Sequence, residues 1–434
     1  MLLRCVISGA CALIIGCVVT WAGETAPVVY KATPISKLEQ QAQERVPATP
    51  RVQLLDAGAA ELSSVESVET GPDGEAPNYL RALSPTPHAI APFANLVNAA
   101  LFTGALEPEV KMAMGMRIAQ LHDSPYVAAH MARLMRSTER GRSLLKALKN
   151  EQLDSLQPAD QLAIDYAEWL SQDVHGVSDS DFRRVRAYFD DGQVVELTTA
   201  TCFFNYFTRF TEALNLPVEK WAIDNVPPAV HGTNSAPVAR VTLISDKEME
   251  AIKSYEANRA AQTATKSWGI GFANSMRSMY LAPEMALAWG KYGNAAREYD
   301  AVSRELKLQV SFAVSMANGC RYCTLHQVLG LKRLDVSTAK LMQMRKDDSA
   351  LTPQELAAVT FARKLTREPA SITDADYRAL EGQFGKQGAL EILLQTCNFA
   401  YMNHFTDGLR LPSEDAAVQT YREVYGTDFS RAAR

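Results

Sequence analysis

The sequence predicts an all-α protein built from two tandem helical domains that pack as a pseudo-symmetric pair. Apolar residues recur at helical spacing over 160–170 and 355–365, and Pro158 and Pro353 stand where the first turn of each helix would lie. An internal repeat relates the two halves of the chain. With 434 residues, 47% of them hydrophobic, the chain is long enough for two or three domains with packed cores.

The N-terminus resembles an export leader. Arg4 precedes the uncharged apolar run 5–19, which is short for a membrane span. Cleavage after Ala22 and lipidation of Cys17 are both compatible with the pattern, and an uncleaved anchor is a third possibility. We therefore expect residues 1–22 to be a signal peptide or lipoprotein leader, and the protein to be exported, either periplasmic or lipid-anchored to a bacterial membrane.

Composition divides the rest of the chain. Residues 23–77 are rich in Ala, Pro, Glu and Ser, which predicts a poorly ordered arm with a short helix near 35–45. Residues 225–240 carry the Pro and Gly signals of a linker. The linker separates a first domain at 78–224 from a second at 241–425.

The two domains resemble each other. Tyr126 and His130 recur as Tyr322 and His326, an offset of 196 residues, and after one slip the offset becomes 195, so that Cys202 recurs as Cys397. Ordered matches over about 140 residues indicate a duplication, so the domains are named the first and second repeat. Further matched pairs are Asn78 and Asn274, Arg81 and Arg277, Pro87 and Pro283, Glu109 and Glu305, Pro158 and Pro353, Asp181 and Asp376, and Glu196 and Glu391.

Composition also excludes some functions. The net charge is −5 and no block of Lys or Arg stands out, which argues against nucleic-acid binding. No haem, flavin or nucleotide motif is present, so no cofactor and no metal is predicted. Of seven Cys, four lie beyond the leader, too few for a disulfide scaffold in a chain of this length.

The chemistry of the sequence concentrates at Cys320 and Cys323. Apolar residues alternate over 306–316 as in a strand, but the uninterrupted length favours a helix that stops at Asn318-Gly319. A new helix would then begin at Cys320, with Cys323 one turn away and about 5 Å between their Cα atoms, within disulfide range. The helix dipole there predicts a lowered thiol pKa.

His326 follows one further turn along, close enough to exchange a proton with Cys323. Three interpretations of the pair remain: a redox centre, which we favour, a structural disulfide, or half of a zinc site that Cys397 and His404 would complete. Cys202 and Cys397 are expected to be buried helix residues.

The segment Asn318-Gly-Cys-Arg-Tyr-Cys-Thr-Leu-His326 resembles the signature of the carboxymuconolactone decarboxylase and alkyl hydroperoxidase D-like superfamily. The stretch Cys397-Asn-Phe-Ala-Tyr-Met-Asn-His-Phe-Thr-Asp-Gly-Leu409 resembles the closing helix of that family. The resemblance extends over 274–412, with 78–217 as a degenerate copy. It implies an all-helical fold, usually oligomeric, so a homo-oligomer is expected.

The resemblance also implies a reaction. Cys323 would attack a peroxide and become a sulfenic acid, Cys320 would resolve it as a disulfide, and a dithiol reductant protein would restore both. His326 would belong to the proton relay. The family's relay Glu lies twelve residues before the first Cys, where this chain has Leu308, and the nearest acid is Glu305.

In the first repeat Ser124 and Val127 replace the two Cys, whereas Tyr126 and His130 remain. That repeat is expected to be a scaffold that substitutes for a second subunit, or else a Cys-free decarboxylase-type site with His130 as acid/base. For the whole chain the sequence predicts a thiol-dependent peroxidase. The alternatives are a carboxymuconolactone decarboxylase-like lyase or isomerase and a non-catalytic exported helical scaffold.

Overall fold

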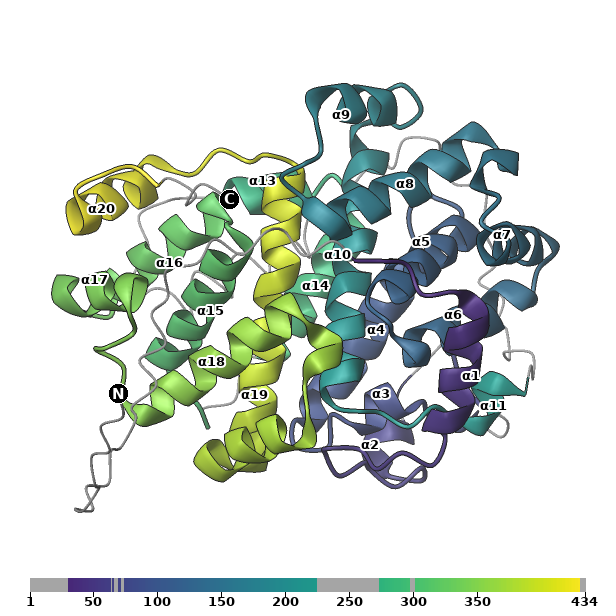
Figure 1. The fold of residues 1–434 in the computed structure, drawn as a ribbon, viewed down its shortest axis with the longest axis horizontal. Coiled ribbons are helices and arrows are strands. Elements are labelled where there is room, and N and C mark those ends of the chain that lie inside the picture. The colour runs from purple at the N-terminus through teal and green to yellow at the C-terminus, as the bar shows by residue number, and fades with distance from the viewer. Residues whose placement is uncertain are drawn as a thin grey trace, which may run out of the picture.

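The computed structural model describes residues 30–63, 65, 69–71, 74–224, 273–296 and 301–429, which form helices and connecting loops without a β-strand (Figure 1). The all-α prediction is confirmed for this part of the chain. The predicted leader (1–22) and linker (225–240) lie outside the described residues. Among the helices that are described, none combines the length and apolarity that crossing a membrane requires.

The helices of the two repeats follow the same order. Those of the arm and first repeat are α1 (Ile35–Arg45), α2 (Ala60–Ser63), α3 (Asn78–Arg81), α4 (Ile90–Phe102), α5 (Pro108–Leu121), α6 (Pro125–Arg136), α7 (Glu139–Lys149), α8 (Pro158–Asp173), α9 (Asp179–Arg186), α10 (Asp191–Ala213) and α11 (Lys220–Ile223). Those of the second are α13 (Asn274–Met279), α14 (Pro283–Ala295), α15 (Arg304–Asn318), α16 (Arg321–Arg333), α17 (Thr338–Lys346), α18 (Pro353–Arg367), α19 (Asp374–Gly408) and α20 (Asp415–Tyr425).

Matching start signals explain the matching helices. Pro158 and Pro353 occupy the first turn of α8 and α18, as predicted. Ser178 and Thr373 form capping boxes at the start of α9 and α19, in which each hydroxyl accepts the N–H of the residue three positions on. Gly385, at φ 69°, interrupts α19 at the place where the first repeat passes from α9 to α10.

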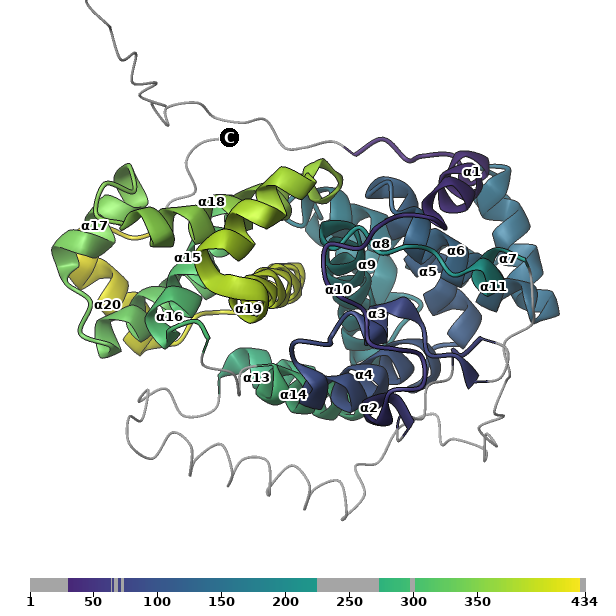
Figure 2. The same cartoon turned by 90° about the horizontal axis from the view of Figure 1, so that it is seen from below.

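The repeats pack against each other through two helix pairs. The long helices α10 and α19 lie side by side, and α14 lies against α4 of the first repeat (Figures 1 and 2). The hydroxyls of Tyr206 on α10 and Tyr292 on α14 hydrogen-bond across this boundary, and the ring of Phe93 on α4 lies against that of Tyr292 with centroids 5.0 Å apart. One continuous hydrophobic core contains residues of both repeats.

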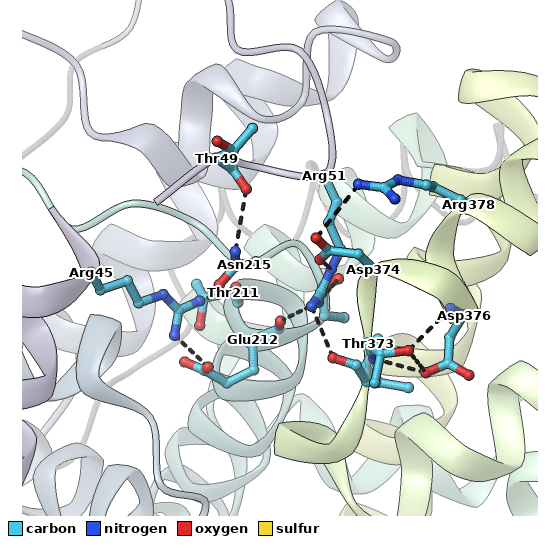
Figure 3. Close-up of polar contacts among 12 residues, drawn as sticks. Arg45, Thr49, Arg51, Thr211, Glu212, Asn215, Thr373, Asp374, Asp376 and Arg378 are labelled. Atoms are coloured by element: carbon cyan, nitrogen blue, oxygen red, sulfur yellow. Dashed lines mark hydrogen bonds and ion pairs between the residues drawn. The ribbon is translucent and has the colours of Figure 1, made fainter. Parts of the chain in front are cut away.

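The prediction of a poorly ordered arm is wrong for residues 30–63, although its short helix is present as α1. Ile35 and Leu38 of α1 are buried in the core, and Arg45 pairs with Glu212 of α10. Figure 3 shows Arg51 reaching from the carbonyl of Glu212 (3.1 Å) to the carboxylate of Asp374 (2.7 Å). The arm therefore ties the end of α10 to the start of α19, because its scattered apolar and basic residues have tertiary partners that composition does not show.

Candidate functional site

The two cysteines lie where α15 ends and α16 begins. Gly319 closes α15 in the left-handed conformation at φ 68°, as the Asn318-Gly319 pair predicts. Cys320 is the N-cap residue of α16, and its sulfur accepts the backbone N–H of Cys323 at 3.3 Å. Both side chains are buried, and both sulfurs are free thiols. The local sequence thus places two thiols one helical turn apart.

Thr406 on α19 faces both thiols. Its Oγ1 lies 3.4 Å from the sulfur of Cys320 and 3.5 Å from that of Cys323. The Thr406 hydroxyl donates its own proton to the carbonyl of Met402 at 3.0 Å, which leaves the oxygen available to accept from the thiols. Met402 and Leu411 pack over the pair and complete its cover.

Burial changes the acidity that the helix dipole predicts. Complete desolvation raises the pKa of the Cys320 thiol well above its usual value, and the neighbouring Cys323 adds to the rise. The prediction of a lowered thiol pKa is therefore wrong for Cys320. The sequence shows that Cys320 begins a helix, but it does not show that α19 and the loop after it exclude water from that end.

His326 is paired with a carboxylate that the sequence analysis missed. Its Nε2 lies 2.6 Å from Oε2 of Glu414, just before α20, and its Nδ1 donates to the carbonyl of Tyr322 at 2.7 Å. The Tyr322 hydroxyl donates to the other oxygen of Glu414 at 2.9 Å. Both ring nitrogens of His326 therefore face oxygen acceptors.

Burial opposes ionisation of Glu414, but the hydrogen bonds from His326 and from the N–H of Asn274 lower its pKa to about 2. Glu305 lies elsewhere, bound to Lys340 at 2.9 Å, and Leu308 is packed in a hydrophobic cluster. The contacts of His326 run to Tyr322 and Glu414 rather than to either thiol. The structure thus forms two adjoining groups, the thiols with Thr406 and the imidazole with Glu414.

The repeat offset contains the signal that would have identified Glu414. Glu219 and Glu414 are 195 residues apart, and each stands two residues after a Leu-Pro pair. In the first repeat, Glu219 makes the same contacts: Oε2 lies 3.0 Å from Nε2 of His130, and Oε1 accepts the hydroxyl of Tyr126 at 2.8 Å. The network of tyrosine, histidine and glutamate is therefore present in both repeats.

The first repeat adds a second carboxylate from the arm. Glu69 lies 2.6 Å from Nδ1 of His130, and all three side chains of the Glu69–His130–Glu219 cluster are buried. Burial alone would lower the pKa of His130, but the two carboxylates raise it to about 10. His130 is fully enclosed, with a carboxylate at each ring nitrogen, so no substrate group can reach it without opening the cluster.

Ser124 occupies the place of Cys320 as N-cap of α6, and it donates to Oε1 of Glu212 at 2.7 Å.

The other cysteines of the described chain, Cys202 and Cys397, are fully buried. Desolvation raises the pKa of Cys397 to about 12. Within the residues described, no three His, Cys, Asp or Glu side chains group closely enough to bind a metal ion. A groove of about 530 Å³ between 49–54 and the start of α19 contains no cysteine.

The comparisons assign a family to this part of the chain. Residues 283–364, which include both thiols and His326, match the Carboxymuconolactone decarboxylase family, so the chain carries a domain of that family. This agrees with the resemblance found in the sequence. No curated protein matches the chain.

Two solved structures of the debrominase Bmp8 match part of the chain. The complex with 2,3,4-tribromopyrrole has a TM-score of 0.36 and 20% identity, and covers 44% of this chain and 100% of that chain. The apo structure has a TM-score of 0.35 and 22% identity, with 44% and 98% covered.

Proposed function

We propose that this protein is an exported thiol-dependent peroxidase that reduces hydroperoxides through Cys320 and Cys323. The observation that carries the proposal is the pair itself: two free thiols one turn apart at the start of α16, both facing Thr406. The pair lies within the family domain at 283–364. Disulfide formation needs only a short movement of side chains that are already adjacent.

The reaction balances in three steps. The Cys323 thiolate attacks one peroxide oxygen, the O–O bond breaks, and the alcohol leaves with a proton while Cys323 becomes a sulfenic acid. The Cys320 thiolate then attacks that sulfur, which forms the disulfide and releases water. A dithiol partner returns both thiols by exchange and is itself oxidised to a disulfide. In an exported protein, this partner belongs to the same compartment.

In the proposed reaction, the Tyr322–His326–Glu414 network donates and accepts the protons. His326 follows Cys323 by one turn of α16, and its Nε2 lies 2.6 Å from Oε2 of Glu414. The leaving alkoxide in the first step needs a proton, and an imidazole held by a carboxylate is a suitable donor. The network would also receive the proton that Cys323 loses.

The proposal extends to the architecture: two alkyl hydroperoxidase D-like repeats form a pseudo-symmetric pair in which only the second has redox chemistry. The shared helix order, the α10–α19 and α4–α14 contacts and the duplicated network support this arrangement. The first repeat keeps the framework, whereas Ser124 and Val127 remove its thiols. Fusion makes the contact between repeats intramolecular, at high effective concentration.

The test is a peroxide-consumption assay with dithiothreitol as reductant, comparing the wild type with the Cys320→Ser/Cys323→Ser double variant. We expect the wild type to consume peroxide catalytically and the double variant to match the uncatalysed rate. Equal consumption by the two proteins would reject the proposal. A Cys320–Cys323 disulfide that no dithiol reduces would instead assign the pair a structural role.

Glu414 provides a more specific prediction. Glu414→Gln keeps the shape of the side chain but removes the negative charge that faces Nε2 of His326. We expect the peroxidase rate to fall by roughly 10²-fold, the contribution of one acid/base group. The control is Glu305→Gln, at the nearest acid in sequence to the family's relay position, which should keep the wild-type rate. A large loss of rate in Glu305→Gln together with a wild-type rate in Glu414→Gln would instead assign the proton relay to Glu305.

A further inference from the structure

A histidine of the first repeat reaches the turn that carries Cys320. His175, in the loop between α8 and α9, places Nε2 2.8 Å from the backbone carbonyl of Asn318. Because a carbonyl only accepts, Nε2 carries the proton and donates it. The same nitrogen lies 3.5 Å from Oδ2 of Asp407 on α19. His175 thus contacts the second repeat at two places.

Both contacts flank the thiols. Asn318 is separated from Cys320 only by Gly319, and its side chain also donates to Asn403 of α19 at 2.9 Å. Asp407 directly follows Thr406, whose hydroxyl faces both sulfurs. The turn from which Cys320 projects is therefore held from one side by α19 and from the other by the first repeat.

The first repeat shows that the position of Asp407 is within reach of the N-cap side chain. Its counterpart there, 195 residues earlier, is Glu212, which accepts a hydrogen bond from Ser124, the counterpart of Cys320. Glu212 also pairs with Arg45 of the arm, whereas Asp407 faces His175. Each carboxylate beside the N-cap thus lies within 4 Å of a side-chain nitrogen from outside its own repeat.

The loop that carries His175 is itself anchored. Arg410, just beyond α19, donates to the carbonyl of Val177 at 2.7 Å and pairs with Asp179. The side chain of His175 is 7% exposed, so the contact with Asn318 is shielded from water. The geometry fixes the imidazole independently of the thiols.

We propose that His175 is a positioning residue of the Cys320–Cys323 centre: by holding the Asn318 carbonyl beside Asp407, it sets where Cys320 stands relative to Cys323. This role rests on the proposed function, and it makes the redox centre composite, since the first repeat contributes a side chain to it. The step that depends on this position is disulfide closure, in which the Cys320 thiolate attacks the oxidised sulfur of Cys323. The first attack, by Cys323, does not require Cys320 to be in place.

The experiment measures the attack by Cys323 and the closure of the disulfide by Cys320 separately, in the wild type and in His175→Ala. The reaction is followed by stopped flow in the reduced full-length protein with the leader cysteines Cys5, Cys11 and Cys17 replaced by Ser. Dithiodipyridine then releases one pyridinethione when Cys323 attacks and a second when Cys320 closes the disulfide, while Cys202 and Cys397 are buried. We expect the first release within about twofold of the wild-type rate and the second about 10-fold slower, because a small misplacement of a reacting group costs at least that much. With peroxide, the same variant should accumulate sulfenic acid that dimedone traps.

Two variants supply the controls. His175→Gln keeps a donor for the Asn318 carbonyl and should restore closure to within about threefold of the wild type. His88→Ala removes another histidine that crosses between the repeats, at 2.9 Å from the carbonyl of Ala295, and should leave both releases unchanged. If His175→Ala does not fold, His175→Leu keeps the volume, removes the donor and takes its place.

Closure at the wild-type rate in the variant without the donor would overturn the proposal. Equal slowing in His88→Ala would also overturn it, because the effect would then belong to the interface as a whole. The dithiodipyridine reaction does not involve peroxide. A protein that consumes no peroxide but shows slow closure in His175→Ala would refute the peroxidase function and keep the positioning role.

Discussion

We expect Cys323→Ser to lower the rate of the proposed peroxide reduction by on the order of 10³-fold or more, because a serine hydroxyl cannot form the sulfenic acid that would start the cycle. The helix start and the cover of Met402 and Leu411 remain, since Cys320 is still the N-cap of α16 and serine is smaller than cysteine. In the first repeat Val127 occupies the position of Cys323, so α6 forms there without a thiol. The measurement is steady-state peroxide consumption with excess dithiol.

Cys320→Ser gives a different signature. Cys323 should still reduce one equivalent of peroxide and then stall as a sulfenic acid, because no neighbouring thiol is left to resolve it. Mass spectrometry after dimedone labelling would find the adduct on Cys323. The matched control is Cys202→Ala, which removes a fully buried thiol of the first repeat and should keep full activity. An adduct on Cys320 in the Cys323→Ser variant, with single-turnover activity, would reverse the two roles.

His130→Ala destabilises the protein by about 3–5 kcal/mol, the range found when one partner of a buried ionic cluster is removed. Two carboxylates, Glu69 and Glu219, would be left in a site from which water is excluded. Urea unfolding monitored by circular dichroism measures the loss. His326→Ala should cost less, because one carboxylate rather than two contacts that ring. Equal losses in the two variants would show that Glu69 adds nothing.

The stability from His130 also depends on pH in a defined direction. The folded pKa of about 10 is above the unfolded value of 6.5, so the folded state binds the proton more tightly. The stabilisation is fully present below about pH 6.5 and is lost as the pH rises through about 10. The difference in unfolding free energy between wild type and His130→Ala should therefore shrink between about pH 6 and pH 10. A difference that grows over this range would contradict the ionic cluster.

Local sequence predicts the features that local physics determines. Gly319 ends α15, Pro353 begins α18, and the cap at Thr373 forms, because each depends on residues within one helical turn. Comparison of the two repeats predicts more than the local pattern does, because the offset of 195 residues aligns Glu219 with Glu414, the carboxylate that the local pattern did not indicate.

Other features depend on tertiary contacts. The raised pKa of Cys320 comes from the exclusion of water around the start of α16, which no spacing in the sequence encodes. Glu69 lies in a stretch whose composition is typical of disorder, yet it is buried against His130. His175 has no motif around it, and only the packing of the first repeat on the second brings it to Asn318.

The arm constrains the order in which the chain can reach its final state. Its Tyr30 hydroxyl donates to the carbonyl of Arg367 at 2.8 Å, across 337 residues of chain, and its Arg51 binds Asp374 across 323. The segment leaves the ribosome early, but these partners are synthesised late, so the arm can complete its contacts only after the chain has been translated through Asp374. Contacts of such long sequence separation form late and slowly. The first segment to be made is thus among the last to dock, and a chain interrupted before Asp374 would leave Arg51 without its acidic partner.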